Sequence, residues 1–184
     1  MADQVASGPG TVTVLTGPPG AGKSTVARLL ADALPLSVHL HSDDFWHYVR
    51  QGRIAAYLPQ AHRQNQVVID ALAQAAFAYA AGGYHVICDG IVGPWFIDVF
   101  RTAAPARAIE LHYVILRPDE PTTVRRAVDR GGQALTDPEP VRSLYRQFTG
   151  LGPYEPHVLD STHLTPQTTV AALRQALSQG TYRL

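Results

Sequence analysis

The chain has 184 residues, of which 46% are hydrophobic and 16% are charged. This composition supplies enough apolar side chain to bury a core without disulfides, and it excludes a chain that is disordered throughout. Fifteen basic and fifteen acidic residues give a formal net charge of zero, which argues against nucleic acid as a partner. The lone cysteine, Cys88, cannot form an internal disulfide, and the apolar run 71–81 is too short to cross a bilayer. We expect a cytoplasmic protein with no membrane span.

Strand and helix patterns alternate along the chain. Residues 1–10 are small and polar, and they predict a flexible tail before a single domain over residues 11–184. Short apolar and β-branched runs predict strands over residues 11–16, 36–41, 84–88, 109–116 and 157–159. Apolar residues at helical spacing predict helices over residues 24–33, 63–81, 121–129 and 166–177. This order predicts an α/β fold in which helices cover both faces of a parallel sheet.

A glycine-rich turn links the first predicted strand to the first predicted helix. Residues 17–24 read GPPGAGKS and match the phosphate-binding pattern G-x-x-x-x-G-K-[ST]. In this pattern the lysine, here Lys23, reaches the β- and γ-phosphates, and the Ser24 hydroxyl ligates magnesium. Lys23 is the only lysine among the fifteen basic residues. The predicted nucleotide contacts are Gly17, Gly20, Ala21, Gly22, Lys23, Ser24 and Thr25. Thr25 fits equally well as an ordinary residue of the first helical turn.

Carboxylates directly follow the second and third predicted strands. Ligands gather beyond the carboxyl ends of the strands in doubly wound sheets, so both acidic sites are expected at one cleft. We predict that Asp43 is the base that takes the proton of an acceptor hydroxyl, and that Asp44 orients the acceptor or completes the magnesium shell. The two roles could be reversed, and either residue alone fits a helix N-terminus. Asp89 occupies a Walker-B-like place, where a carboxylate holds magnesium through water or contacts the acceptor, with a turn-forming aspartate as the alternative.

Two arginines precede a glycine pair. Arg126 and Arg130 are four residues apart on one helix face, and Gly131-Gly132 opens a stretch up to Pro140 that we expect to be mobile. Arginines brought in by a closing segment stabilise a transferring phosphoryl group, so we predict that both contact the nucleotide as a lid, with Arg125 facing outward. A solvated helix face is the alternative reading.

Aromatic residues follow both acidic sites. Trp46 and Trp95, together with Arg53, would suit an acceptor that has a ring and a negative group, although ordinary packing explains them equally well. His39 and His41 point to one side of the second strand. Zinc needs a third ligand, and none follows at ligand spacing, so alternation along a strand explains this pair.

The combination of residues 17–25, Asp43-Asp44, Arg126 with Arg130, and the segment 160–166 resembles the small P-loop kinases. Within them the chain is most similar to chloramphenicol phosphotransferase-like and to gluconate or shikimate kinase-like enzymes. The resemblance implies ATP with Mg²⁺, and a P-loop NTPase three-layer α/β/α sandwich with a five-stranded parallel sheet of the nucleoside-kinase type and an arginine lid. The base aspartate of the family corresponds to Asp43, its lid arginines to Arg126 and Arg130, and its adenine-side loop to residues 160–165.

These features predict transfer of the γ-phosphoryl group of ATP to a hydroxyl of a small molecule, such as a sugar, polyol, nucleoside or antibiotic. A polynucleotide-end kinase is one alternative, against which the neutral charge argues. The other is a nucleotide-binding resistance or regulatory protein that sequesters its ligand without transfer.

Overall fold

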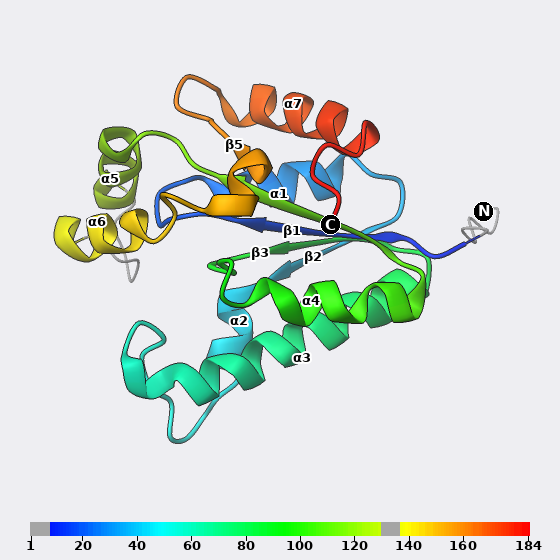
Figure 1. The fold of residues 1–184 in the computed structure, drawn as a ribbon, viewed down its shortest axis with the longest axis horizontal. Helices are drawn as coiled ribbons and strands as arrows, with labels where there is room; N and C mark the ends of the chain where they lie inside the picture. The colour runs from blue at the N-terminus through cyan, green and yellow to red at the C-terminus, as the bar shows by residue number, and fades with distance from the viewer. Residues whose placement is uncertain (1–7, 130–136) are drawn as a thin grey trace.

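The fold was analysed in a computed structural model that describes residues 8–129 and 137–184. Its centre is a five-stranded sheet in which all paired strands are parallel, in the order β2-β3-β1-β4-β5. The strands are β1 (Thr11–Thr16), β2 (Ser37–His41), β3 (His85–Asp89), β4 (Glu110–Leu116) and β5 (Val158–Leu159). The predicted α/β fold with a five-stranded parallel sheet is confirmed (Figure 1).

Helices flank the sheet on both faces. They are α1 (Lys23–Asp32), α2 (Ser42–His47), α3 (His62–Ala81), α4 (Ile97–Ala103), α5 (Glu120–Asp129), α6 (Pro138–Arg146) and α7 (Pro166–Ser178). The described residues also include three short 3₁₀ helices: η1 (Pro59–Ala61), η2 (Pro105–Arg107) and η3 (Gly152–His157). Helices α1 and α7 lie on one face, α3 and α4 lie on the other, and α5 and α6 lie beyond the carboxyl ends of the strands (Figure 1). Within the described ranges, no helix is both long and apolar enough to span a bilayer.

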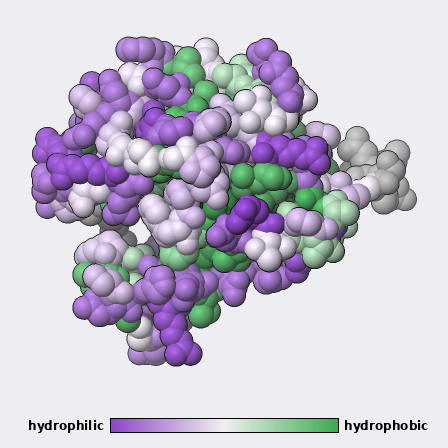
Figure 2. Space-filling model, in the orientation of Figure 1, coloured by the Kyte–Doolittle hydropathy of each residue, from purple (hydrophilic) through white to green (hydrophobic). Residues whose placement is uncertain are grey.

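Each face of the sheet has its own hydrophobic core, because successive residues of a strand point to opposite faces. Val14 packs with Leu72, Phe77 and other residues of the α3 and α4 face. Its neighbour Leu15 packs instead with Leu30 and other residues of the α1 and α7 face. Strand β1 is therefore buried on both sides from Val12 to Thr16, and its sequence TVTVLT contains no charged residue. The outer surface over α5 and α6 is mostly hydrophilic, whereas hydrophobic side chains are exposed near the C-terminus (Figure 2).

Helices α4 and α6 were not expected from the sequence, and α2 was considered only as an alternative explanation of Asp43 and Asp44. The start of α6 corrects the expectation of a mobile stretch up to Pro140, because Pro138–Arg146 is helical. The Asp137 side chain caps this helix by accepting a hydrogen bond from the backbone N–H of Glu139, at 3.1 Å, and Pro138 occupies the first turn. Gly131-Gly132 lie outside the described residues.

Val92, in the segment that follows β3, is hydrogen-bonded to strands β1 and β4. The Val92 N–H donates a hydrogen bond to Thr16 Oγ1 at 3.0 Å, and the Tyr113 hydroxyl donates one to the Val92 carbonyl oxygen at 2.9 Å. Both contacts are buried. They tie residues of β1 and β4 to the backbone just before Trp95, which carries the aromatic group predicted at the acceptor.

The Tyr113 contact yields the first prediction. Tyr113→Phe leaves the buried Val92 carbonyl without its donor, so we expect a loss of about 1–3 kcal/mol in the free energy of unfolding. Urea denaturation measures this loss. Tyr79→Phe is the matched control, because Tyr79 is 46% exposed, and it should change the free energy by no more than about 0.5 kcal/mol. Equal effects of the two variants would show that the hydroxyl of Tyr113 does not stabilise the loop.

Candidate active site

The phosphate-binding loop connects the end of β1 to the start of α1. Gly22 is the N-cap residue of α1, with a left-handed φ of 90°, and the first intrahelical bond runs from the Val26 N–H to the Gly22 carbonyl, at 3.0 Å. The N–H groups of residues 23–25 therefore have no acceptor within the helix. Together with the helix dipole they form a site for an anion, as the sequence pattern predicts.

Lys23 folds back over this loop. Its Nζ donates hydrogen bonds to the carbonyl oxygens of Gly17 and Pro18, both at 3.0 Å. The ammonium group is thus held at the mouth of the loop by two neutral acceptors. A bound polyphosphate would offer it charged acceptors instead, which attract an ammonium group more strongly than neutral carbonyl oxygens do.

Helix α5 packs directly on the phosphate loop. A Cβ atom on Gly20 would lie 2.2 Å from the Thr123 carbonyl oxygen, so only glycine permits this approach, and its φ of 84° is also a conformation that favours glycine. The contact brings α5 and its half-buried Arg126 to one wall of a cavity of about 250 Å³. Its other walls are formed by Gly20, Ala21, Gly22, Thr25, Val26, Ser161, Leu164, Pro166 and Thr169.

This cavity combines the phosphate loop with the segment that resembles an adenine-side loop. Ser161 is 3% exposed, and its Oγ has no hydrogen-bond partner among the described residues. A buried hydroxyl without a partner is costly, and a ligand in the cavity could satisfy it. The cavity therefore joins the phosphate loop to a buried hydroxyl that a ligand could contact.

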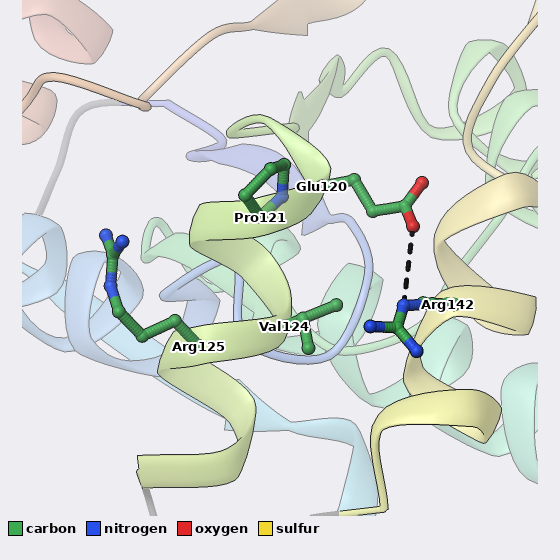
Figure 3. A pocket seen from close by; sticks show the side chains of 5 residues that line it. All are labelled: Glu120, Pro121, Val124, Arg125 and Arg142. Atoms are coloured by element: carbon green, nitrogen blue, oxygen red, sulfur yellow. Dashed lines mark ion pairs between the residues drawn. The ribbon is translucent and has the colours of Figure 1, made fainter.

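A second cavity, of about 550 Å³, lies between α5 and α6 and includes no residue of the phosphate loop (Figure 3). Arg125 points away from Arg142 here, and Arg142 Nε lies 3.7 Å from Glu120 Oε1 (Figure 3). Arg125 is exposed, whereas Arg126 lines the cavity at the phosphate loop. The two neighbouring arginines thus face different surroundings. The other arginine predicted in the lid, Arg130, lies outside the described residues.

Asp89 ends β3 and is fully buried. Ser24 Oγ donates a hydrogen bond to Asp89 Oδ2 at 2.6 Å, while His39 Nε2 and His41 Nδ1 lie 2.6 Å and 2.9 Å from Asp89 Oδ1. Burial alone would raise the pKa of Asp89, but these hydrogen bonds outweigh it and lower the pKa below its usual range. The hydrogen bond to Asp89 raises the pKa of His41, against the effect of its partial burial. The buried carboxylate therefore stays charged next to the phosphate loop.

Asp43 and Asp44 are exposed in the first turn of α2, directly after β2. Asp43 Oδ2 lies 3.6 Å from His41 Nε2. Because the other ring nitrogen of His41 contacts Asp89, one histidine connects the exposed carboxylate with the buried one. Both aspartates were predicted at the site from the sequence, whereas His41 was expected to be an ordinary strand residue.

The oxygen atoms at the phosphate loop suit magnesium. Mg²⁺ prefers oxygen ligands and is usually bound by one or two protein groups together with substrate phosphates. Ser24 and Asp89 bring a hydroxyl and a carboxylate together at 2.6 Å. In the part of the chain that the structure describes, no group of three or more His, Cys, Asp or Glu side chains could hold a metal ion by itself. The site therefore fits a metal that arrives with a nucleotide.

The two tryptophans predicted at the acceptor have different environments. Trp46 is 8% exposed, and its indole N–H donates a hydrogen bond to Asn65 Oδ1 at 2.9 Å. Its polar group is thus occupied inside the protein. Trp95 is 47% exposed and packs on Phe148, with the ring centroids 5.8 Å apart. Of these two rings, Trp95 is the one with surface available to a ligand.

The connection between α2 and α3 carries Arg53, which is exposed. The side chain of Gln64, in α3, forms two hydrogen bonds with the backbone of Ile54, the residue after Arg53. It accepts from the Ile54 N–H and donates to the Ile54 carbonyl oxygen, each at 2.8 Å. Asn65 Nδ2 donates to the Ala56 carbonyl at 2.7 Å. The path of this connection is therefore set by two amide side chains of α3.

Comparison with known proteins assigns the family. The chain belongs to the AAA domain family, whose model matches residues 12–149. No curated protein matches the sequence significantly.

Solved structures of small kinases share the fold. A sugar kinase from Janibacter sp. HTCC2649 has a TM-score of 0.69 at 22% identity, and the match covers 92% of this chain and 95% of that one. A gluconokinase from Sinorhizobium meliloti 1021 has a TM-score of 0.67 at 18% identity, covering 93% of each chain. The APS kinase of Mycobacterium tuberculosis in complex with AMPPNP and APS has a TM-score of 0.66 at 18% identity, covering 93% of this chain and 99% of that one. The predicted resemblance to small P-loop kinases is confirmed at the level of the fold.

The packing of α5 on the phosphate loop can be tested with two glycines. Gly20 and Gly180 both have left-handed φ angles, 84° and 69°, but a Cβ on Gly180 would meet nothing within 4 Å. We expect Gly180→Ala to cost roughly 1–2 kcal/mol of unfolding free energy through backbone strain alone. Gly20→Ala should cost about 1–3 kcal/mol more, because the backbone of α5 must also move. Chemical denaturation of both variants gives the comparison, and equal losses would contradict a close seating of α5 on the loop.

Proposed function

We propose that this protein is an ATP-dependent kinase that transfers the γ-phosphoryl group to a hydroxyl of a small molecule. The observation that carries the proposal is the meeting of three elements at the carboxyl end of the sheet. The phosphate loop with Lys23 follows β1, Asp89 ends β3 against Ser24, and Asp43 follows β2 and reaches Asp89 through His41. We assign the kinase domain to residues 11–184 and expect it in the cytoplasm, where ATP is available.

In this proposal the nucleotide is held by the loop that begins at Gly17. The N–H groups of Ser24 and Thr25 at the start of α1 and the Lys23 ammonium bind its phosphates, and the wall that contains Ser161 accepts the base. Ser24 and Asp89 would hold magnesium, which neutralises phosphate charge when bound with the nucleotide. Asp44, at the rim on α2, remains the candidate for a further contact to the metal shell or to the acceptor.

Asp43 is proposed as the base because it is an exposed carboxylate beside the buried phosphate-loop network. The acceptor oxygen attacks the γ-phosphorus and forms the new O–P bond, while its proton passes to an Asp43 carboxylate oxygen. The bond between the γ-phosphorus and the β,γ-bridging oxygen breaks, and ADP leaves. Arg126 and Arg130 are proposed to stabilise the charge on the transferring group.

We propose that the acceptor is bound between the α2–α3 connection and the segment after β3. Arg53 on the first and Trp95 on the second are exposed and can contact a ligand directly. Trp46, which is buried, would act on the acceptor by supporting the α2–α3 connection through Asn65.

The proposal is tested by ADP release that depends on an added acceptor. A panel of sugars, polyols, nucleosides and antibiotics with free hydroxyl groups serves as the set of acceptors, and the phosphorylated product is identified by mass. A phosphorylated product in equal amount to the ADP released supports the kinase. Tight binding of an acceptor without turnover would instead indicate a protein that sequesters its ligand.

Lys23→Ala should lower kcat/KM by at least about 100-fold, because a charged donor to the transferring phosphate is removed. The fold should survive, because the hydrogen bonds from Nζ to the Gly17 and Pro18 carbonyl oxygens lie within the loop itself. Turnover and thermal unfolding are measured on the same preparation. Loss of folding together with loss of activity would count against the assignment. Lys23→Arg serves as the control that keeps the charge.

Asp43→Asn should lower kcat by about 100-fold to 10,000-fold with little change in ATP affinity, because a carboxamide cannot accept the proton. The neighbouring Asp44→Asn is the matched variant, since both aspartates occupy the first turn of α2. Steady-state kinetics and ATP titration of both variants decide between them. A larger loss of kcat in Asp44→Asn would exchange the two roles, and a collapse of ATP binding with turnover retained would exclude Asp43 as the base.

A further inference from the structure

We propose that His39 and His41 are positioning residues that fix the orientation of the Asp89 carboxylate, so that one of its oxygens stays on Ser24 to receive a metal-bound nucleotide. This inference rests on the proposed function and extends it to two residues with no assigned role. Neither histidine is proposed to touch the reacting atoms.

The strand register explains how both rings reach the same carboxylate. His41 and Asp89 are direct partners on the neighbouring parallel strands β2 and β3, and His39 is opposite Ile87. Residues two apart in a strand point to one face, so both imidazoles lie on the same side of β2. Their nitrogens converge on a single atom, Asp89 Oδ1, at 2.6 Å and 2.9 Å.

The two carboxylate oxygens of Asp89 thus have different hydrogen-bond partners. Oδ1 takes both histidines, which leaves Oδ2 to the Ser24 hydroxyl at 2.6 Å. A carboxylate on a single-bonded side chain can otherwise rotate and exchange its oxygens. Fixing Oδ1 from β2 therefore fixes Oδ2 toward the phosphate loop. Partners that orient a metal-binding group in this way commonly change metal affinity 10-fold to 100-fold when removed.

The same arrangement connects the carboxylate to the proposed base. His41 uses Nδ1 for Asp89 and presents Nε2 to Asp43, at 3.6 Å. Its side chain is 34% exposed, compared with 67% for Asp43 and 0% for Asp89. His41 thus contacts both the exposed carboxylate of Asp43 and the buried carboxylate of Asp89. Of these two carboxylates, His39 contacts that of Asp89.

The test uses the different ring nitrogens that the two histidines employ. A glutamine side chain can place its amide nitrogen near the position of a histidine Nε2, and an asparagine side chain can place it near Nδ1. His39→Gln and His41→Asn should therefore keep the contact to Asp89. His39→Asn and His41→Gln should lose it, although they are equally polar. A purely structural role would not follow the position of the amide.

The readout is the binding of ATP measured calorimetrically with Mg²⁺ and again with EDTA, independently of turnover. The ratio of interest is the ATP affinity with Mg²⁺ divided by the ATP affinity with EDTA. We expect it to stay within about threefold of wild type in His39→Gln and His41→Asn. In His39→Asn and His41→Gln the ratio should fall about 10-fold to 100-fold, with ATP affinity in EDTA unchanged. His85→Asn is the control, because His85 contacts Thr11 at the opposite end of the sheet, at 3.1 Å, and it should leave the ratio unchanged.

Two amides are compared at each position, so one position at which both variants fold is enough to decide. Equal ratios for the two amides at that position, whether high or low, would overturn the positioning role while leaving the kinase proposal intact. A wild-type protein whose ATP affinity does not depend on Mg²⁺ would overturn both.

Discussion

The charge of Asp89 is the constraint around which the carboxyl end of the sheet is arranged. A carboxylate shielded from water has to be matched by donors, since an unpaired buried charge costs on the order of several kcal/mol. Here the donors come from β2 on one side and from the phosphate loop on the other. Only a strand that lies between β2 and β1 can carry such a residue, and β3 is that strand. The strand order therefore determines which residues can donate hydrogen bonds to Asp89.

The regular elements of the fold could be predicted closely because burial leaves a periodic pattern in the sequence. Strand β1 has the expected bounds Thr11–Thr16, and α3 begins one residue before its expected start, at His62. The helices that escaped prediction are short or begin with signals typical of loops. Helix α4 has seven residues, and α6 starts with two prolines among its first three residues. Such elements are held mainly by contacts with distant parts of the chain, which a local pattern does not contain.

For the site, the sequence suggested candidate residues but not which of them meet. Ser24 was predicted to bind the metal and Asp89 to serve the metal or the acceptor, and their contact joins residues 65 positions apart and depends on β3 lying beside β1. The proposed role of His39 and His41 depends in turn on β2 pairing with β3 in one register. The visible signal was an i, i+2 histidine pair at the end of a strand. Without the strand order, that pair was explained by ordinary alternation along a strand.

The connection between α2 and α3 is held through its backbone. Gln64 bonds both the N–H and the carbonyl of Ile54, and Asn65 bonds the carbonyl of Ala56. Contacts to main-chain atoms do not depend on which side chains the connection carries. Outward residues such as Arg53 can thus be exchanged in evolution without altering the path of the loop. A lineage could acquire new acceptor preferences by substitution at this rim, while the two amides of α3 preserve the scaffold beneath it.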